Sequence, residues 1–272
     1  MMRVVVLLIA GVAGVLTAPV RAAPDPEEVR ACSRANLPEK TMVQDLTLDS
    51  TDRAGNRRQI EATFFVKRFE TENRANLVVR APIDLSGVSY LMVDTPESDR
   101  LFLYLPSLQK VRRVSGKTAT ESLLGTDFSY EDMKQLRSIS EGGTLAGEGT
   151  GEIDGRPVDI VALTPPAGDE SAYERLVFRV DRETCVTLRV DFFERGAELT
   201  KRYTADPSSL RQVGERWLAT RSTMTDRQDG TETQLEITSV EYDEGVSDGV
   251  FNSRTFYLGV YDPDAARRRD AG

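Results

Sequence analysis

Most of the chain beyond residue 40 alternates apolar and polar side chains in short runs that turn residues separate. In 59–69, Ile60, Ala62, Phe64 and Val66 recur at every second position, the period of a strand with one buried face. The turn residues of 52–56 precede this run, so 42–51 and 57–69 are predicted to form a hairpin. The same pattern predicts further strands at 77–80, 89–94, 101–105, 156–163, 173–180, 185–194, 198–204, 216–226 and 231–242.

Few segments depart from this strand rhythm. Acidic and proline residues at 24–28 predict a short helix that runs to about Asn36 and that Pro38 ends. A helical turn is predicted at 130–136, and the prolines of 164–169 predict a loop. No internal repeat or domain boundary is visible, so 23–272 is expected to be a single domain. The predicted fold is mainly β, one antiparallel sheet or open barrel of about eleven strands with few helices.

The first 22 residues differ from the rest of the chain. Arg3 precedes an apolar run from Val4 to Leu16, and 20–22 read Val-Arg-Ala. This pattern predicts a cleavable signal peptide at 1–22. The alternative, a membrane anchor, needs ~20 apolar residues, whereas Pro19 and Arg21 end this run early. Cys32 does not follow the cleavage site directly, so a soluble, unlipidated, secreted chain is expected, as in the bacterial periplasm.

The net charge argues against nucleic acid as a partner. The formal charge is −9, and removal of the segment that holds Arg3 and Arg21 makes it −11. An acidic protein lacks general attraction for phosphate backbones, and the Arg268–Arg269 pair is interpreted as a solvated tail.

Two cysteines, Cys32 and Cys185, are left to pair in an oxidising compartment. An even pair favours one disulfide between the N-terminal helix and a central strand. Two separate buried thiols are the alternative, because the sequence does not show whether the two Cα atoms come close enough.

The absence of histidine excludes the largest classes of catalytic and metal chemistry. Ser-His-Asp and Cys-His nucleophiles and histidine-containing metal sites cannot form, and two cysteines cannot make a four-thiolate zinc site. No phosphate-binding glycine motif occurs, since the glycine-rich 147–151 is flanked by acids. No metal or cofactor is therefore expected.

One acidic cluster needs separate consideration, because two carboxylates suffice for glycoside hydrolysis. Asp127, Glu131 and Asp132 lie close together in the sequence. Such clusters are common on the surface of an acidic protein, and Asp127 beside Phe128 and Tyr130 is predicted to organise a loop by accepting from nearby backbone amides. A hydrolase would instead need strongly shifted carboxyl pKa values in a cleft.

Two segments carry a family resemblance. Residues 103–114 read LYLPSLQKVRRV and resemble the YLP-x-L-x-KVRR signature of outer-membrane lipoprotein-sorting proteins. Residues 124–133 read LGTDFSYEDM and resemble the second signature of the same family, G-S-D-F-T-Y-E-D, with Thr126 and Ser129 as conservative departures. Segments 84–91, 217–221 and 237–256 are also similar, although Ala219 replaces a family proline. The resemblance covers roughly 30–258.

The family is the LolA-like branch of a superfamily that includes LolA, LolB and RseB types. The resemblance implies a half-barrel of about eleven strands around an apolar cavity, with helices as a lid. It implies a carrier that shields a lipid or the acyl chains of a lipoprotein on the way to the outer membrane, together with an RND-type inner-membrane exporter. It implies no enzyme. A sensor that binds a protein partner is the second function in the superfamily.

A carrier of this kind is physically reasonable, because each acyl CH₂ removed from water contributes ~0.8 kcal/mol. The wall should be aliphatic and aromatic. At any one position, ordinary core packing is the alternative interpretation. The candidate wall residues are Phe64, Val66, Leu77, Val79, Leu91, Val93, Leu103, Phe178, Leu188 and Trp217.

Lys110, Arg112 and Arg113 form a compact basic group in an acidic chain. On a strand, Lys110 and Arg112 would share one face and Arg113 the other. One interpretation is a transient contact with anionic headgroups or an acidic membrane partner. The other is local pairing with Asp127, Glu131 or Asp132.

Overall fold

The computed structural model describes residues 23–95, 99–114, 120–166, 171–242 and 245–258. The predicted signal peptide, the Arg268–Arg269 pair and 167–169 of the predicted 164–169 loop lie outside these ranges. Within them the protein is mainly β, with two α-helices, α1 (Pro26–Ala35) and α2 (Tyr130–Glu141), and short 3-10 turns η1 (Pro106–Leu108), η3 (Pro207–Ser209), η4 (Asp248–Phe251) and η5 (Phe256–Leu258).

One 13-stranded sheet dominates the fold, and a 2-stranded sheet is attached to it. The strands are β1 (Thr41–Thr51), β2 (Arg57–Arg68), β3 (Asn73–Ala81), β4 (Ser89–Asp94), β5 (Arg100–Leu105), β6 (Lys110–Val114), β7 (Thr144–Ile153), β8 (Arg156–Thr164), β9 (Tyr173–Asp181), β10 (Thr187–Glu194), β11 (Glu198–Ala205), β12 (Leu210–Val213), β13 (Arg216–Ala219), β14 (Arg221–Asp226) and β15 (Thr231–Tyr242). The predicted hairpin is confirmed as β1–β2.

The strand count of about eleven was too low. Strands β6, β7 and β12 were not predicted, and the predicted strand 216–226 breaks at Thr220, where β13 leaves the large sheet to pair with β12. The glycines of β7 hide it, because glycine weakens strand propensity. They are needed here, since a Cβ on Gly147 would lie 2.3 Å from the carbonyl oxygen of Pro24, and Gly149 has a φ of +133° where the register shifts.

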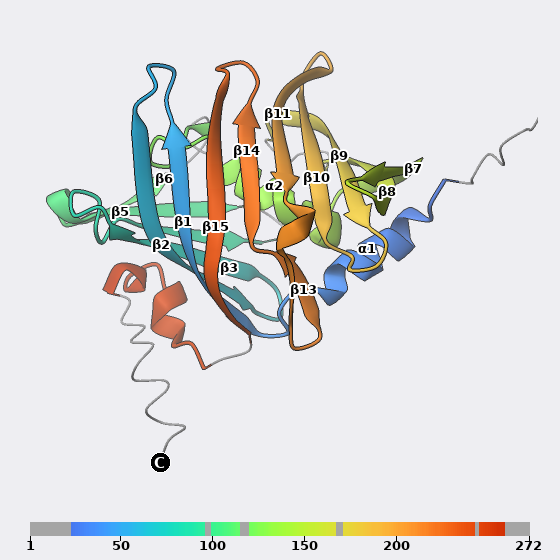
Figure 1. Ribbon diagram of the computed structural model, residues 1–272. Helices are drawn as coiled ribbons and strands as arrows, with labels where there is room; N and C mark the ends of the chain where they lie inside the picture. The colour runs from blue at the N-terminus through green and yellow to red at the C-terminus, as the bar shows by residue number, and fades with distance from the viewer. Residues whose placement is uncertain (1–22, 96–98, 115–119, 167–170, 243–244, 259–272) are drawn as a thin grey trace, which may run out of the picture.

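The topology explains why helix α2 covers the inside of the sheet. The sheet order is β6-β5-β4-β3-β2-β1-β15-β14-β11-β10-β9-β8-β7, with every neighbouring pair antiparallel and the sheet not closed into a barrel. Strands β6 and β7 therefore form the two opposite edges of the sheet, although β7 is the next strand after β6 in the sequence. The segment between them must cross from edge to edge, and α2 lies in that crossing, behind the central strands in Figure 1.

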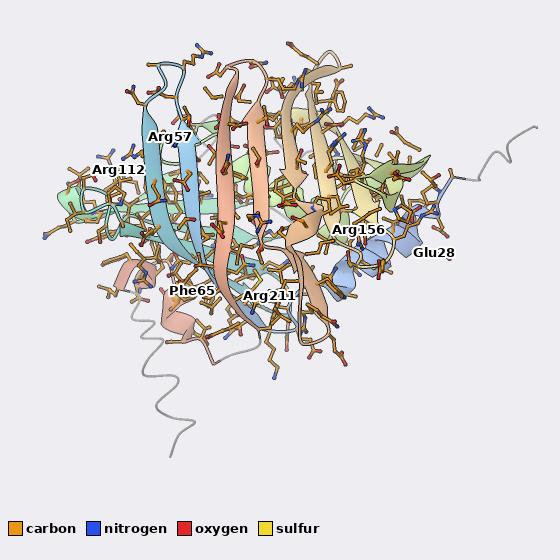
Figure 2. All side chains as sticks on the ribbon, viewed as in Figure 1. Glu28, Arg57, Phe65, Arg112, Arg156 and Arg211 are labelled. Carbon is orange, nitrogen blue, oxygen red and sulfur yellow. A yellow bond between two sulfur atoms is a disulfide. The ribbon has the colours of Figure 1, made fainter. Side chains whose placement is uncertain are left out.

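The main hydrophobic core lies between the inner face of the sheet and this crossing segment. It joins Ile60, Ala62, Phe64 and Val66 of β2, as the alternation predicted, to residues of α2 such as Ile139. The residues that alternate with these along β2 point to the outer face of the sheet. Phe65, for example, packs with Val250 and Phe251 of the C-terminal 3-10 turns, which lie below the sheet in Figures 1 and 2.

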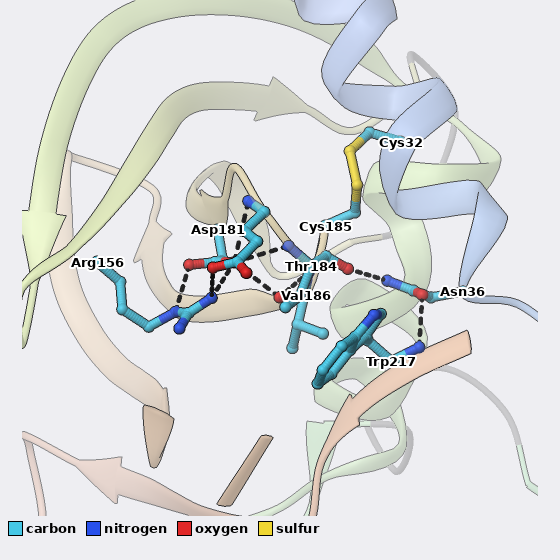
Figure 3. The surroundings of a disulfide bond; sticks show 9 residues. Cys32, Asn36, Arg156, Asp181, Thr184, Cys185, Val186 and Trp217 are labelled. Carbon is cyan, nitrogen blue, oxygen red and sulfur yellow. Dashed lines mark hydrogen bonds and ion pairs between the residues drawn. A yellow bond between two sulfur atoms is a disulfide. The ribbon is translucent and has the colours of Figure 1, made fainter. Parts of the chain in front are cut away.

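Helix α1 closes one end of the sheet and is covalently fixed there. Asp25 caps it by accepting from the amide of Glu27 at 2.9 Å, and Asn36 ends it. The predicted Cys32–Cys185 disulfide is confirmed, with Cα atoms 5.4 Å apart (Figure 3). Cys185 lies in the turn between β9 and β10 rather than in the predicted central strand. Asn36 extends the link by donating to the Thr184 carbonyl and accepting from the Trp217 amide, each at 2.8 Å.

Asp181 organises the turn that holds Cys185. Its buried carboxylate accepts from Arg156 at 2.7 Å and from the Thr184 amide and hydroxyl at 2.8 Å (Figure 3). Burial opposes ionisation, but these hydrogen bonds outweigh it and lower the pKa of Asp181.

Neither helix in the described part of the chain has the length and hydrophobicity of a membrane-spanning segment.

Candidate functional site

An apolar cavity of about 230 Å³ lies between the inner face of the sheet and α2. The sheet supplies side chains from β1, β2, β11, β14 and β15, and the crossing segment supplies Phe128, Met133 and Leu136. Met133 and Leu136 are three residues apart on α2, so they share the helix face that looks onto the sheet. The remaining apolar wall consists of Leu37, Pro38, Met42, Leu46, Phe64, Val66, Tyr203, Ala219, Leu235 and Ile237.

The polar groups of the cavity come from a few positions. The polar residues that line it are Asn36, Gln44, Arg68, Arg137 and Ser222. Arg68, at the end of β2, is exposed. The cavity thus offers an apolar interior and a guanidinium that reaches water, an arrangement suited to an amphiphile rather than to a fully polar ligand.

Eight of the ten predicted wall residues fall into three groups. Phe64 and Val66 line the cavity. Leu77, Val79 and Phe178 belong to the same core and are nearly fully buried, while Leu103 packs against that core. Leu188 lies in the neighbouring core cluster towards the disulfide end, and Trp217 is half-buried on β13.

Leu91 and Val93 must be corrected as wall candidates. They pack with Phe256 in a cluster on the outer face, whereas Met92 and Tyr90 of the same strand face the inner core. Strand β4 is apolar on both faces, because the C-terminal segment covers the outside. The period of two found the strand but does not tell which face is concave.

Several lining residues were missed by the sequence reasoning. Met42 and Leu46 alternate along β1, opposite Val66 and Ala62 of β2, and Leu235 and Ile237 alternate along β15. This period-two pattern was visible in both strands, but the sequence alone does not place β1 beside β15, so it could not assemble them into one wall.

The second family signature fixes α2 at its first turn. The Ser129 hydroxyl accepts from the Asp132 amide at 3.1 Å, and the Asp132 carboxylate accepts from the Ser129 amide at 2.8 Å. This reciprocal pair is a capping box, which satisfies two amides that the helix leaves without intrahelical partners. The spacing Ser-x-x-Asp was available in the sequence as a signal for a helix start.

Asp132 also ties α2 to the sheet. Its carboxylate is completely buried and pairs with Lys201 of β11 at 2.8 Å, and the Tyr173 hydroxyl donates to it at 2.5 Å. Burial, followed by the charge of Asp132, raises the pKa of Tyr173 far above its usual range, so the phenol remains a donor.

A second tie joins α2 to β4. Asp94 accepts from the Tyr130 hydroxyl at 3.0 Å and from Arg137 at 2.7 Å. Burial, with Asp94 as the next cause, raises the pKa of Tyr130 well above its usual range. Through Tyr130, Asp132 and Arg137, the two ties anchor α2 to β4, β9 and β11. Helix α2 is the roof of the cavity.

Asp127 does not bond to local amides as predicted. Its carboxylate accepts from the hydroxyls of Thr231 at 2.5 Å and Thr233 at 2.6 Å, both on β15, and its own amide donates to Thr233 at 2.8 Å. Asp127 therefore fastens the crossing segment to the sheet centre, a role that requires residues about a hundred positions away in the chain.

The three acids of the cluster are all occupied by structural contacts. Glu131 accepts from Ser171 at 2.5 Å and from Gln135 at 2.9 Å, which completes the set after Asp127 and Asp132. None of the three lines the apolar cavity. Among the described residues, no group of three or more acids or cysteines is placed to hold a metal ion.

The basic group lies on the edge strand β6. The register pairs Lys110 and Arg112 with Leu105 and Leu103, and Arg113 with Phe102, so the predicted division between the two faces holds. The proposed local pairing with Asp127, Glu131 or Asp132 is wrong, because those carboxylates bond to other residues. All three cations are exposed.

The fold of this chain is similar to the folds of several solved structures. The chain is 20% identical to a domain from Vibrio parahaemolyticus described as an outer-membrane lipoprotein-sorting protein, with a TM-score of 0.76 over 85% of this chain and 97% of that one. A DUF1329 family protein from Desulfovibrio piger is 24% identical, with a TM-score of 0.77 over 87% and 98%. A LolA superfamily protein from Nitrosomonas europaea is 13% identical, with a TM-score of 0.66 over 85% and 98%.

The comparison with curated proteins finds no significant match. A model of a family described as uncharacterized protein matches residues 71–257, which include both signatures. Because this match spans more than half of the chain, the chain belongs to that family. Its open curved sheet is similar in fold to that of a LolA superfamily protein.

Proposed function

We propose that this protein is a secreted carrier that holds an acyl chain of a lipid or lipoprotein in the cavity under α2. The single observation that carries the proposal is the apolar cavity itself, which a structural core would have filled. The similarity of the fold to a domain described as a lipoprotein-sorting protein supports it. The occupied acids of the 127–132 cluster support a binding protein rather than an enzyme.

The cavity volume sets a minimum for the cargo. At roughly 30 Å³ per water-sized group, 230 Å³ has room for at least about seven methylene groups. Burying these would contribute about 6 kcal/mol. The cavity therefore accepts at least part of one acyl chain, with Arg68 at the rim near the headgroup.

The disulfide and the N-terminal pattern support a proposed cellular setting. A Cys32–Cys185 bond favours an oxidising compartment, and 1–22 has the pattern of a secretory signal. We place the protein in the periplasm, as a single domain from residue 23 onward. There it would receive cargo from an RND-type inner-membrane exporter and deliver it toward the outer membrane.

Blocking the cavity should weaken acyl binding at least tenfold without unfolding the protein. Leu235→Trp fills the space between β15 and α2, and displacing even two buried methylenes costs about tenfold in affinity. The expected result is at least a tenfold rise in the Kd of a fluorescent fatty-acyl probe, measured by titration.

Leu199→Trp is the matched control, because Leu199 is half-buried on β11 and does not line the cavity. The control should bind the probe as the unmodified chain does, with a similar Tm. A folded Leu235→Trp variant with unchanged affinity would argue against this cavity as the cargo site.

A further inference from the structure

The exposed large apolar side chains of the described residues gather at one edge of the sheet. Four such residues exist there, and their exposed fractions are 91% for Ile83, 46% for Leu108, 36% for Val111 and 60% for Leu258. Leu108 and Val111 belong to the β5–β6 connection and to β6 itself. The other two are far away in sequence from these.

Contacts between elements show why they meet. Ile83 lies in the β3–β4 turn, whose Gly87 would place a Cβ 3.2 Å from Pro106 in the β5–β6 connection. Leu258 follows Tyr257, whose ring stacks on Tyr104 of β5 with centroids 3.9 Å apart. Tyr104 is paired with Val111 in the register. All four apolar residues therefore surround the β5–β6 edge, which we name the edge patch.

The same edge carries the basic group. Lys110 and Arg112 extend from the inner side of β6 and Arg113 from the outer side, next to Val111. Within the described part of the chain, none of these three exposed cations forms a salt bridge, whereas partly buried arginines such as Arg137, Arg179 and Arg202 do. These three cations concentrate positive charge at one edge of a chain whose formal net charge is −9.

We propose that the edge patch docks the protein on an anionic lipid bilayer. The apolar residues stand on turns and on an edge strand rather than in a groove, so they suit a soft interface that needs no matching shape. Apolar tips surrounded by Lys and Arg combine burial in the headgroup region with attraction to anionic lipids. The proposal goes beyond cargo binding, since it concerns a surface on which the 230 Å³ cavity has no lining residue.

The test is sedimentation of the processed chain with lipid vesicles. The protein is purified from the cells that make it, and its N-terminal residue is verified by mass spectrometry before use. Binding to phosphatidylglycerol vesicles and to pure phosphatidylcholine vesicles is compared at low and high salt. Two variants are tested, Lys110→Gln/Arg112→Gln/Arg113→Gln and Ile83→Ser/Leu108→Ser. The matched charge control is Arg195→Gln/Arg211→Gln/Arg227→Gln, which removes three exposed cations elsewhere.

The unmodified chain should bind phosphatidylglycerol vesicles, with weaker binding at high salt and on phosphatidylcholine. Removing the three cations of the edge patch should weaken binding on the order of a hundredfold, and the serine variant at least tenfold. The control triple should bind like the unmodified chain. Absence of vesicle binding, an equal loss in the control, or capture only by membranes that contain protein would overturn the proposal. The acyl-probe titration is independent of these outcomes, so failure here leaves the cavity assignment untouched.

Discussion

Replacing both Cys32 and Cys185 by serine is expected to lower the free energy of unfolding by about 5 kcal/mol. The two residues are 153 positions apart in the sequence, so the bond closes a loop that contains more than half of the chain. In the chain-entropy description, closure of such a long loop removes more freedom from the unfolded chain than a short loop would. The loss should appear in urea denaturation, followed by circular dichroism.

The reduced protein supplies the control for this prediction. Adding a thiol reductant to the unmodified chain should reproduce the stability of the double-serine variant, and should leave the variant itself unchanged. The unlinked end, α1 with the β9–β10 turn, should then lose amide protection first, because the remaining ties there are hydrogen bonds such as Asn36 to Thr184. A loss below 1 kcal/mol would contradict the proposed role of the bond.

Asp132→Asn is expected to cost about 3–5 kcal/mol of stability, because it leaves Lys201 charged and buried without its partner. The side chains of Asp132 and Lys201 are 0% and 14% exposed, so the pair is largely shielded from solvent. The substitution also weakens the capping box at Ser129, which alone contributes about 1 kcal/mol. Thermal and urea denaturation measure the change.

Two further variants sharpen this test. Asp229→Asn breaks the ion pair between Asp229 and Arg53, whose side chains are 52% and 65% exposed. This substitution should lower the free energy of unfolding by less than 1 kcal/mol. Asp132→Asn/Lys201→Met should cost less than the sum of the two single changes, since it removes both charges together. If Asp132→Asn proves as mild as Asp229→Asn, the pair does not anchor α2.

The sequence predicted best where apolar residues recur at every second position and a clear turn follows or precedes the run. The β1–β2 hairpin was found because Ile60, Ala62 and Phe64 keep this period and turn residues lie between the two strands. Strand β7 was missed because its glycines serve close backbone approach rather than packing. Leu91 and Val93 were placed on the wrong face because both faces of β4 are buried.

The candidate site depended more strongly on distant contacts. The wall of the cavity joins β1 and β2 to β15, and Asp127 bonds to Thr231 and Thr233, pairings that local patterns do not encode. The family resemblance supplied the expectation of a cavity under a helical lid. The geometry then showed which residues line it and that the second signature fixes the lid.

The central claim is that the cavity carries an acyl chain, and native mass spectrometry of the processed protein from its own cells tests it most directly. Solvent extraction and lipid identification would follow. The account predicts a stoichiometric bound mass that yields an acylated molecule on extraction and is lost in Leu235→Trp. A mass equal to the bare chain, together with no uptake of a fluorescent acyl probe, would contradict the carrier and favour a sensor that binds protein.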